Sequence, residues 1–177
     1  MTRRQAFTFV ELLVAVVVLA ILTLAVLPEA DAEVKEQGKN AALRFEADVF
    51  YARSASVARS DDPIVIKMDQ ANQRYWLARQ SDPSTAITHP QSGAPYVVQL
   101  GPTSDAGFDR VLIHGFDFGG DDELRFDGTG ATDQDAAAVV QFKSGTADYE
   151  VGVYSASADT TISNKFLRDL TAQPGGT

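Results

Sequence analysis

Apolar and polar positions divide the 177 residues into three stretches of different period. Residues 7–27 are apolar on every side of a helix, apart from two threonines and Glu11. As a helix these 21 positions are about 31 Å long at ~1.5 Å per residue, which matches the ~30 Å hydrocarbon core of a bilayer. We therefore predict a membrane-spanning helix over residues 7–27.

The second stretch, residues 28–60, is amphipathic. Small or apolar residues recur in it at spacings of three and four, which is one face of a helix: Val34, Gly38, Ala41, Phe45, Val49, Ala52 and Ser56. Polar residues, Asp48 among them, lie between these positions, and Ala47 is counted with the small core-facing residues. The pattern predicts a helix that packs on a sheet and ends before Pro63, because the residue before a proline avoids helical geometry.

The third stretch, residues 61–177, changes to the period of β-strands. Its β-prone runs are Ile64–Met68, Arg74–Arg79, Tyr96–Leu100, Val111–Phe118, Glu123–Phe126, Ala138–Lys143 and Tyr149–Tyr154. A long polar loop is expected over residues 80–95, and a short helical or loose tail over 164–177. We predict an α+β fold in which the helix packs on an antiparallel β-sheet or sandwich.

Charge and cysteine content exclude several classes of function. The formal net charge is −9, which repels phosphate backbones, so no nucleic-acid partner is expected. The absence of cysteine excludes disulfides, thiolate metal sites and cysteine nucleophiles.

No catalytic arrangement is visible in the sequence. The two histidines, His89 and His114, have no partner at ligand or triad spacing, and no serine lies in a nucleophile elbow. We predict that the chain is not an enzyme and needs no cofactor. The one metal candidate is a calcium site formed by acids in two glycine-rich segments, for which ordinary turns are the preferred interpretation: Asp121, Asp122, Asp127, Asp133 and Asp135.

The N-terminus is open to three interpretations. Arg3 and Arg4 precede the apolar stretch, so the positive-inside rule keeps the N-terminus cytoplasmic and exports the rest. A plain membrane anchor fits this pattern. A secretory signal cleaved after Ala32 also fits, and it would release a soluble exported binding module. Neither interpretation gives a reason for Glu11, because a carboxylate inside a membrane is costly unless it has a partner.

The third interpretation rests on the stretch "RRQAFTFVELLVAVVVLAIL", which resembles the processing motif of type IV pilins and type II secretion pseudopilins. The resemblance implies that residues 1–6 are a leader and that prepilin peptidase cuts after Ala6, where the family prefers glycine. It implies N-methylation of the new terminus at Phe7 and charge pairing between Glu11 and that amine in a neighbouring subunit. Pro28 falls where the family's long helix carries a kink.

A second stretch, "FYARSASVARSDDPIVIKMD", is similar to the minor pseudopilin H (FimT) branch of this family. The similarity implies an inner-membrane subunit with a periplasmic β-domain over residues 61–177. The partners implied are other pilin or pseudopilin subunits, prepilin peptidase and inner-membrane lipid, in a type II secretion system or a type IV pilus. A DNA-uptake minor pilin is a further alternative, but it requires a basic surface that the acidic residues of 61–177 disfavour.

Overall fold

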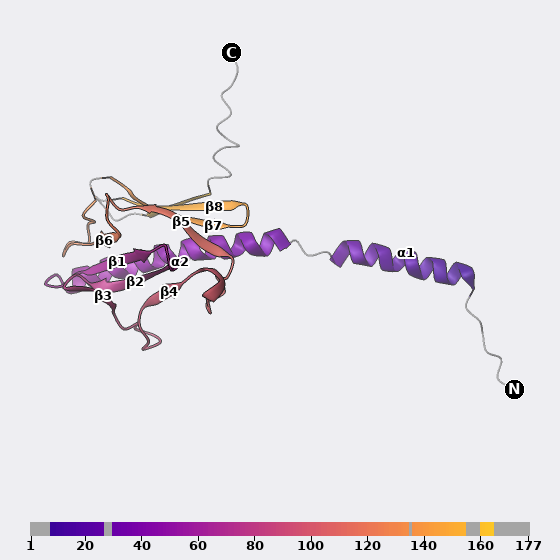
Figure 1. The fold of residues 1–177 in the computed structure, drawn as a ribbon, viewed down its shortest axis with the longest axis horizontal. Helices are drawn as coiled ribbons and strands as arrows, with labels where there is room; N and C mark the ends of the chain where they lie inside the picture. Colours follow the sequence, from indigo (N-terminus) through magenta and orange to yellow (C-terminus); the bar gives the residue numbers. More distant parts are fainter. Residues whose placement is uncertain (1–7, 27–29, 135, 155–159, 165–177) are drawn as a thin grey trace, which may run out of the picture. The chain divides into compact units, whose positions relative to one another are not determined.

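A computed structural model describes residues 8–26, 30–134, 136–154 and 160–164 (Figure 1). The chain divides into two compact units, Met1–Ala32 and Glu33–Thr177. The first unit contains helix α1, Phe9–Val26. Helix α2, Ala30–Ala58, begins at the end of the first unit and runs through the start of the second. The predicted α+β class is confirmed, because α2 packs on antiparallel sheets.

Two antiparallel sheets follow α2 in the described part of the second unit. The first has the order β3-β2-β1-β6, with β4 also paired to β2, and the second has the order β5-β7-β8-β9. The strands are β1 (Ile64–Asp69), β2 (Arg74–Arg79), β3 (Asp82–Ala86), β4 (Val97–Gln99), β5 (Val111–Asp117), β6 (Glu123–Arg125), β7 (Ala138–Ser144), β8 (Ala147–Val153) and β9 (Thr160–Asn164), with a 3-10 turn at Gly101–Thr103. All seven predicted runs therefore contain a strand.

Two strands lie outside the predicted runs. β3 falls inside the segment expected to be an irregular polar loop, and it pairs with β2 through Ala78↔Ala86 and Arg79↔Asp82. β3 is at the edge of its sheet, where a proline such as Pro83 is tolerated because one side of the strand needs no ladder partner. β9 pairs with β8 along Thr160–Asn164, ahead of the predicted tail, which lies outside the described residues except for Asn164.

The predicted core face of α2 is confirmed. Its stripe is buried from Gly38 to Ser56, and only Val34 at its start is partly exposed. Phe45 is fully buried and meets Tyr75 of the first sheet edge-on, with ring centroids 5.3 Å apart. It also meets Phe142 of the second sheet, at 5.8 Å. One aromatic side chain of the helix therefore joins both sheets in a single core.

Small and polar residues fix the two ends of α2 against the sheets. At Gly38 a β-carbon would lie 2.6 Å from the Tyr149 ring, so only glycine permits this approach. Nearby, the Tyr149 hydroxyl donates to the Lys35 carbonyl at 2.8 Å. At the other end the Ser56 hydroxyl donates to the Ala52 carbonyl and accepts from the Ile64 amide, both at 2.8 Å. That hydroxyl ties the last turn of the helix to the first residue of β1.

Two residues of α2 do not lie where the pattern placed them. Ala47 was assigned to the core-facing lining and is exposed. Asp48 was assigned to the polar side and is buried, with 2% of its surface exposed. The reason is the helical spacing: Asp48 follows Phe45 by three positions and therefore shares its face, whereas Ala47 points away from both sheets.

Candidate functional site

Glu11 lies in the first turn of α1, three positions after Thr8, the residue that caps the helix. The Glu11 amide faces the Thr8 hydroxyl oxygen at 3.3 Å and the Thr8 carbonyl at 3.1 Å. Thr8 and Glu11 are separated by three positions, which is the spacing of a capping box and places an acid at the positive end of the helix dipole. This local role was not predicted, although its T-x-x-E signal is visible in the sequence.

The remaining predicted residues of the N-terminal motif cannot be compared with the structure. Ala6, Phe7 and Pro28 lie outside the described residues. The cut after Ala6, methylation at Phe7 and a kink at Pro28 therefore stay predictions.

α1 has an apolar surface that is exposed. Every residue from Thr8 to Ile21 is exposed, and Phe9 exposes 80% of its surface. A helix that is apolar all round is normally buried in protein or in lipid. Among the described residues, however, no helix reaches the combination of length and apolarity needed to cross a membrane, so the predicted span over residues 7–27 is not confirmed.

Helix α2 carries a second exposed apolar surface, opposite its core stripe. Leu43, Phe50 and Val57 follow one another at intervals of seven residues and expose 44%, 44% and 52% of their surfaces. The exposed Ala47 and Ser54 lie between them, so exposed residues recur along this side of the helix at alternating intervals of four and three. We call these five residues the outer stripe. This spacing is that of a seam between packed helices.

The acidic segments are held by basic side chains. Lys67 Nζ donates to Asp122 at 3.1 Å and to Glu123 at 2.8 Å. Arg125 forms ion pairs with Glu123, with Asp121 at 2.9 Å and with Asp133 at 3.3 Å. A guanidinium thus occupies the space between two of the calcium candidates.

Asp127 acts as a turn residue. Its carboxylate accepts from the amides of Thr129 and Ala131 and from the Thr129 hydroxyl, at 2.8, 3.0 and 2.7 Å. These hydrogen bonds, that of the Thr129 side chain above all, lower the pKa of Asp127. Asp135, the last calcium candidate, lies outside the described residues. Among the residues that the structure describes, no three His, Asp or Glu side chains converge as metal ligands would.

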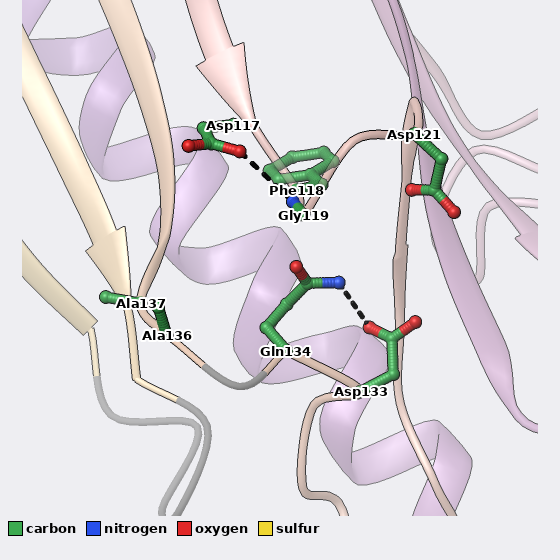
Figure 2. Close-up of a pocket in the computed structure, with 8 residues that line it drawn as sticks. All are labelled: Asp117, Phe118, Gly119, Asp121, Asp133, Gln134, Ala136 and Ala137. Carbon is green, nitrogen blue, oxygen red and sulfur yellow. Dashed lines mark hydrogen bonds between the residues drawn. The ribbon is translucent and has the colours of Figure 1, made fainter.

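A cleft of about 330 Å³ opens beside this segment, between the end of β5 and the start of β7 (Figure 2). Asp117, Asp121 and Asp133 are its acidic residues. Figure 2 shows that Asp117 accepts from the Gly119 amide and Asp133 from the Gln134 side chain, at 3.1 and 2.7 Å. These two carboxylates, like that of Asp121 with Arg125, are thus engaged within the chain.

A polar cluster surrounds the buried Asp48. Its carboxylate accepts from the Tyr75 hydroxyl at 2.7 Å, the Tyr96 hydroxyl at 2.9 Å and Arg44 Nε at 3.2 Å. Burial raises the pKa of Asp48, against the opposing effect of Tyr75 and Arg44. Burial lowers the pKa of Arg44, but the neighbouring Asp48 carboxylate raises it. The net effect is a raised pKa. The cluster joins α2 to the first sheet and has the character of a structural polar core.

Comparisons with known proteins match only the N-terminus. Residues 1–27 match the prokaryotic N-terminal methylation motif. Neither a curated protein nor a solved structure matches the chain. The resemblance to the type IV pilin-like signal is thereby confirmed, and the narrower resemblance to the pseudopilin H branch is not. This chain carries the N-terminal methylation motif typical of type IV pilin-like substrates of prepilin peptidase.

Proposed function

We propose that this protein is a minor pseudopilin or minor pilin, a non-catalytic subunit of the filament of a type II secretion system or a type IV pilus. Prepilin peptidase cuts the leader after Ala6 and Phe7 becomes the methylated N-terminus. The subunit is anchored in the inner membrane with its β-domain in the periplasm, and it then assembles with other pilin-like subunits. The observation that carries the proposal is the methylation motif over residues 1–27.

The exposed apolar surfaces support assembly through helices. In the first unit α1 is exposed on all sides as far as Ile21, and in the second unit the outer stripe of α2 is exposed on the side away from the sheets. Large exposed apolar surfaces mark sites of contact with protein or membrane. In a filament, helices of neighbouring subunits would cover both surfaces.

Glu11 supplies the specificity of this assembly in the proposal. Cleavage creates a cationic amine at Phe7, and the Glu11 carboxylate of the next subunit neutralises it. A charge in an apolar helix costs roughly 2.5–3.5 kcal/mol at the membrane centre and less near an end, so two unpaired charges favour the one register that joins them. The capping contact with Thr8 uses the Glu11 backbone amide and leaves this role of the carboxylate intact.

The proposal predicts that Glu11→Ala is cleaved like the wild type but enters filaments at least about tenfold less, because the Phe7 amine then has no partner. The test co-expresses the variant with prepilin peptidase and the other filament subunits, and measures cleavage by mass and incorporation by quantifying the chain in sheared filaments. Glu36→Ala, which removes an exposed acid of α2, is the matched control and should assemble normally. Incorporation of Glu11→Ala at the level of this control would refute the charge-pairing mechanism.

A further inference from the structure

Strand β5 lies at one end of its sheet. Among the described strands it pairs with β7 alone. The other side of β5 is therefore an edge, and the backbone groups that point to that side have no described strand beside them. The register shifts between Ile113 and Gly115, so this edge contains a β-bulge at His114.

The side chain of Gln73 takes the place of a neighbouring strand at Ile113. Gln73 is the last residue of the turn between β1 and β2, in the first sheet. Its carboxamide oxygen accepts from the Ile113 amide at 2.6 Å, and its Nε2 donates to the Ile113 carbonyl at 3.3 Å. A residue of an antiparallel partner strand exchanges the same two hydrogen bonds with the residue opposite. One side-chain amide thus satisfies both edge groups of Ile113.

Gln70, at the start of the same turn, bonds the next group of the edge. Its Nε2 donates to the His114 carbonyl at 2.8 Å and to the Ile113 carbonyl at 3.3 Å. The Gln73 Nε2 also donates to the Gln70 carbonyl, at 2.7 Å, which fixes the position of that side chain. We call Gln70 and Gln73 the edge cap. The cap joins the two sheets, because its residues belong to the first sheet's turn and its partners to β5 of the second.

The backbone of Gln73 adopts a conformation that is unfavourable for its residue type. Its φ is 53°, and among the described residues it is the one non-glycine residue with a positive φ. Hydrogen bonds hold its peptide in place, since the Gln73 carbonyl accepts from the Leu100 amide at 2.8 Å and from Gln99 Nε2 at 3.1 Å. Glycine or asparagine would adopt this geometry at lower cost, but neither side chain could replace the pair of hydrogen bonds to Ile113. Strain of this kind points to a role for the side chain.

An uncapped β5 edge would suit pairing with β5 of a second copy. The strand contains no lysine or proline, the residues that commonly block edge pairing, and Leu112 exposes 43% of its surface. Its one acidic residue, Asp117, lies at its end. In a two-fold, antiparallel pair of β5 strands the two Asp117 residues would lie at opposite ends, so like charges would not face each other.

We propose that the β5 edge is a strand-pairing surface for a second copy of this chain, and that the edge cap keeps this surface closed in the isolated subunit. Withdrawal of the two carboxamides exposes the Ile113 amide and carbonyl together with the His114 carbonyl, and a second β5 strand can then bond them. The inference depends on the second unit alone and not on the proposed function.

The first measurement is hydrogen exchange of the Ile113 amide in the full-length chain in detergent, by mass spectrometry at a protein concentration low enough to keep copies apart. Gln73→Asn still accommodates the left-handed backbone, but its side chain is one methylene shorter and cannot reach Ile113. Protection of this amide should therefore fall about tenfold, while the amides of β7 and β8 keep theirs. Gln91→Ala removes an exposed carboxamide from another turn and is the matched control, which should exchange like the wild type.

The second measurement detects pairing between copies at high protein concentration. The chain has no cysteine, so Leu112→Cys provides a single site for a nitroxide label. With Gln70→Ala and Gln73→Asn added, electron paramagnetic resonance should show a short distance between labels on two copies, whereas the chain with an intact cap should show none. A label at Val57→Cys, on the outer stripe, reports association through helices and should not respond to loss of the cap.

Three results would overturn the proposal. Slow exchange of the Ile113 amide in Gln73→Asn, equal to that in Gln91→Ala, would show that the cap does not hold the edge. Loss of this protection without short distances at Leu112→Cys would show that the open edge does not pair. Short distances at Leu112→Cys with an intact cap would show that the cap does not close the edge.

Discussion

Replacing Asp48 with alanine is expected to lower the free energy of unfolding by about 3–5 kcal/mol. The carboxylate is 2% exposed and is the shared acceptor of Arg44, Tyr75 and Tyr96. Its removal leaves a partly buried guanidinium and two buried hydroxyls without that acceptor, and each unsatisfied buried donor costs about 1–3 kcal/mol. Denaturant unfolding of the full chain in detergent, followed through the single tryptophan, Trp76, measures the loss.

Variants that each remove one hydrogen-bond donor to Asp48 show how much of this free energy each tyrosine contributes. Tyr75→Phe and Tyr96→Phe each remove one hydroxyl and should each cost about 1 kcal/mol. Glu36→Ala removes an exposed acid of the same helix and should change stability by no more than about 0.5 kcal/mol. An Asp48→Ala variant as stable as Glu36→Ala would show that the cluster does not stabilise the fold.

The cost of Asp48→Ala should also depend on pH. Because burial raises the pKa of Asp48 in the folded chain, the folded state holds this proton over a range in which the unfolded state has lost it. The stability that Asp48 contributes is therefore complete below its unfolded pKa of about 4 and decreases as the pH rises through the folded pKa. The difference between wild type and Asp48→Ala should accordingly be larger in acid than at neutral pH.

Replacing Phe45 with alanine is expected to lower the free energy of unfolding by about 3–5 kcal/mol, through loss of packing alone. Its ring is fully buried and meets Tyr75 and Phe142 edge-on, at 5.3 and 5.8 Å. The cavity would open where α2 and both sheets converge, so collapse of one wall cannot fill it. The same denaturant experiment measures the change.

Phe50→Ala is the matched control for this prediction. Phe50 lies on the same helix and exposes 44% of its surface as part of the outer stripe. Its truncation in the isolated subunit should cost less than about 1 kcal/mol. Equal losses for Phe45→Ala and Phe50→Ala would contradict the assignment of the two faces of α2.

The elements with a strong local period were predictable from the sequence. The core stripe of α2 repeats at three and four residues over six turns, and the strands alternate or form short apolar runs between turn residues. β3 was not predictable in this way, because its sequence "DPSTA" is polar and is paired only through its position beside β2.

The Asp48 cluster was likewise not predictable from a local pattern. Its tyrosine partners lie 27 and 48 positions away, in different elements, so no local pattern connects them. An informative signal was nonetheless present: an acid four residues after Arg44 and three after Phe45 must share the face of the core stripe. The ion pairs of Lys67 with Asp122 and Glu123 were not predictable for the same reason, since Lys67 lies 55 and 56 positions away in β1.

The N-terminal motif differs from these cases because its chemistry is encoded in consecutive residues and read by an enzyme rather than by the fold. The N-terminus of the mature chain therefore reveals whether the protein is processed as a pilin-like subunit. The chain should be purified from the membranes of a host that contains prepilin peptidase, and its first residue determined by mass spectrometry. Cleavage by prepilin peptidase should leave N-methylated Phe7 as the first residue. A chain that begins at Glu33, as cleavage of a secretory signal after Ala32 would leave it, would refute pilin-like processing.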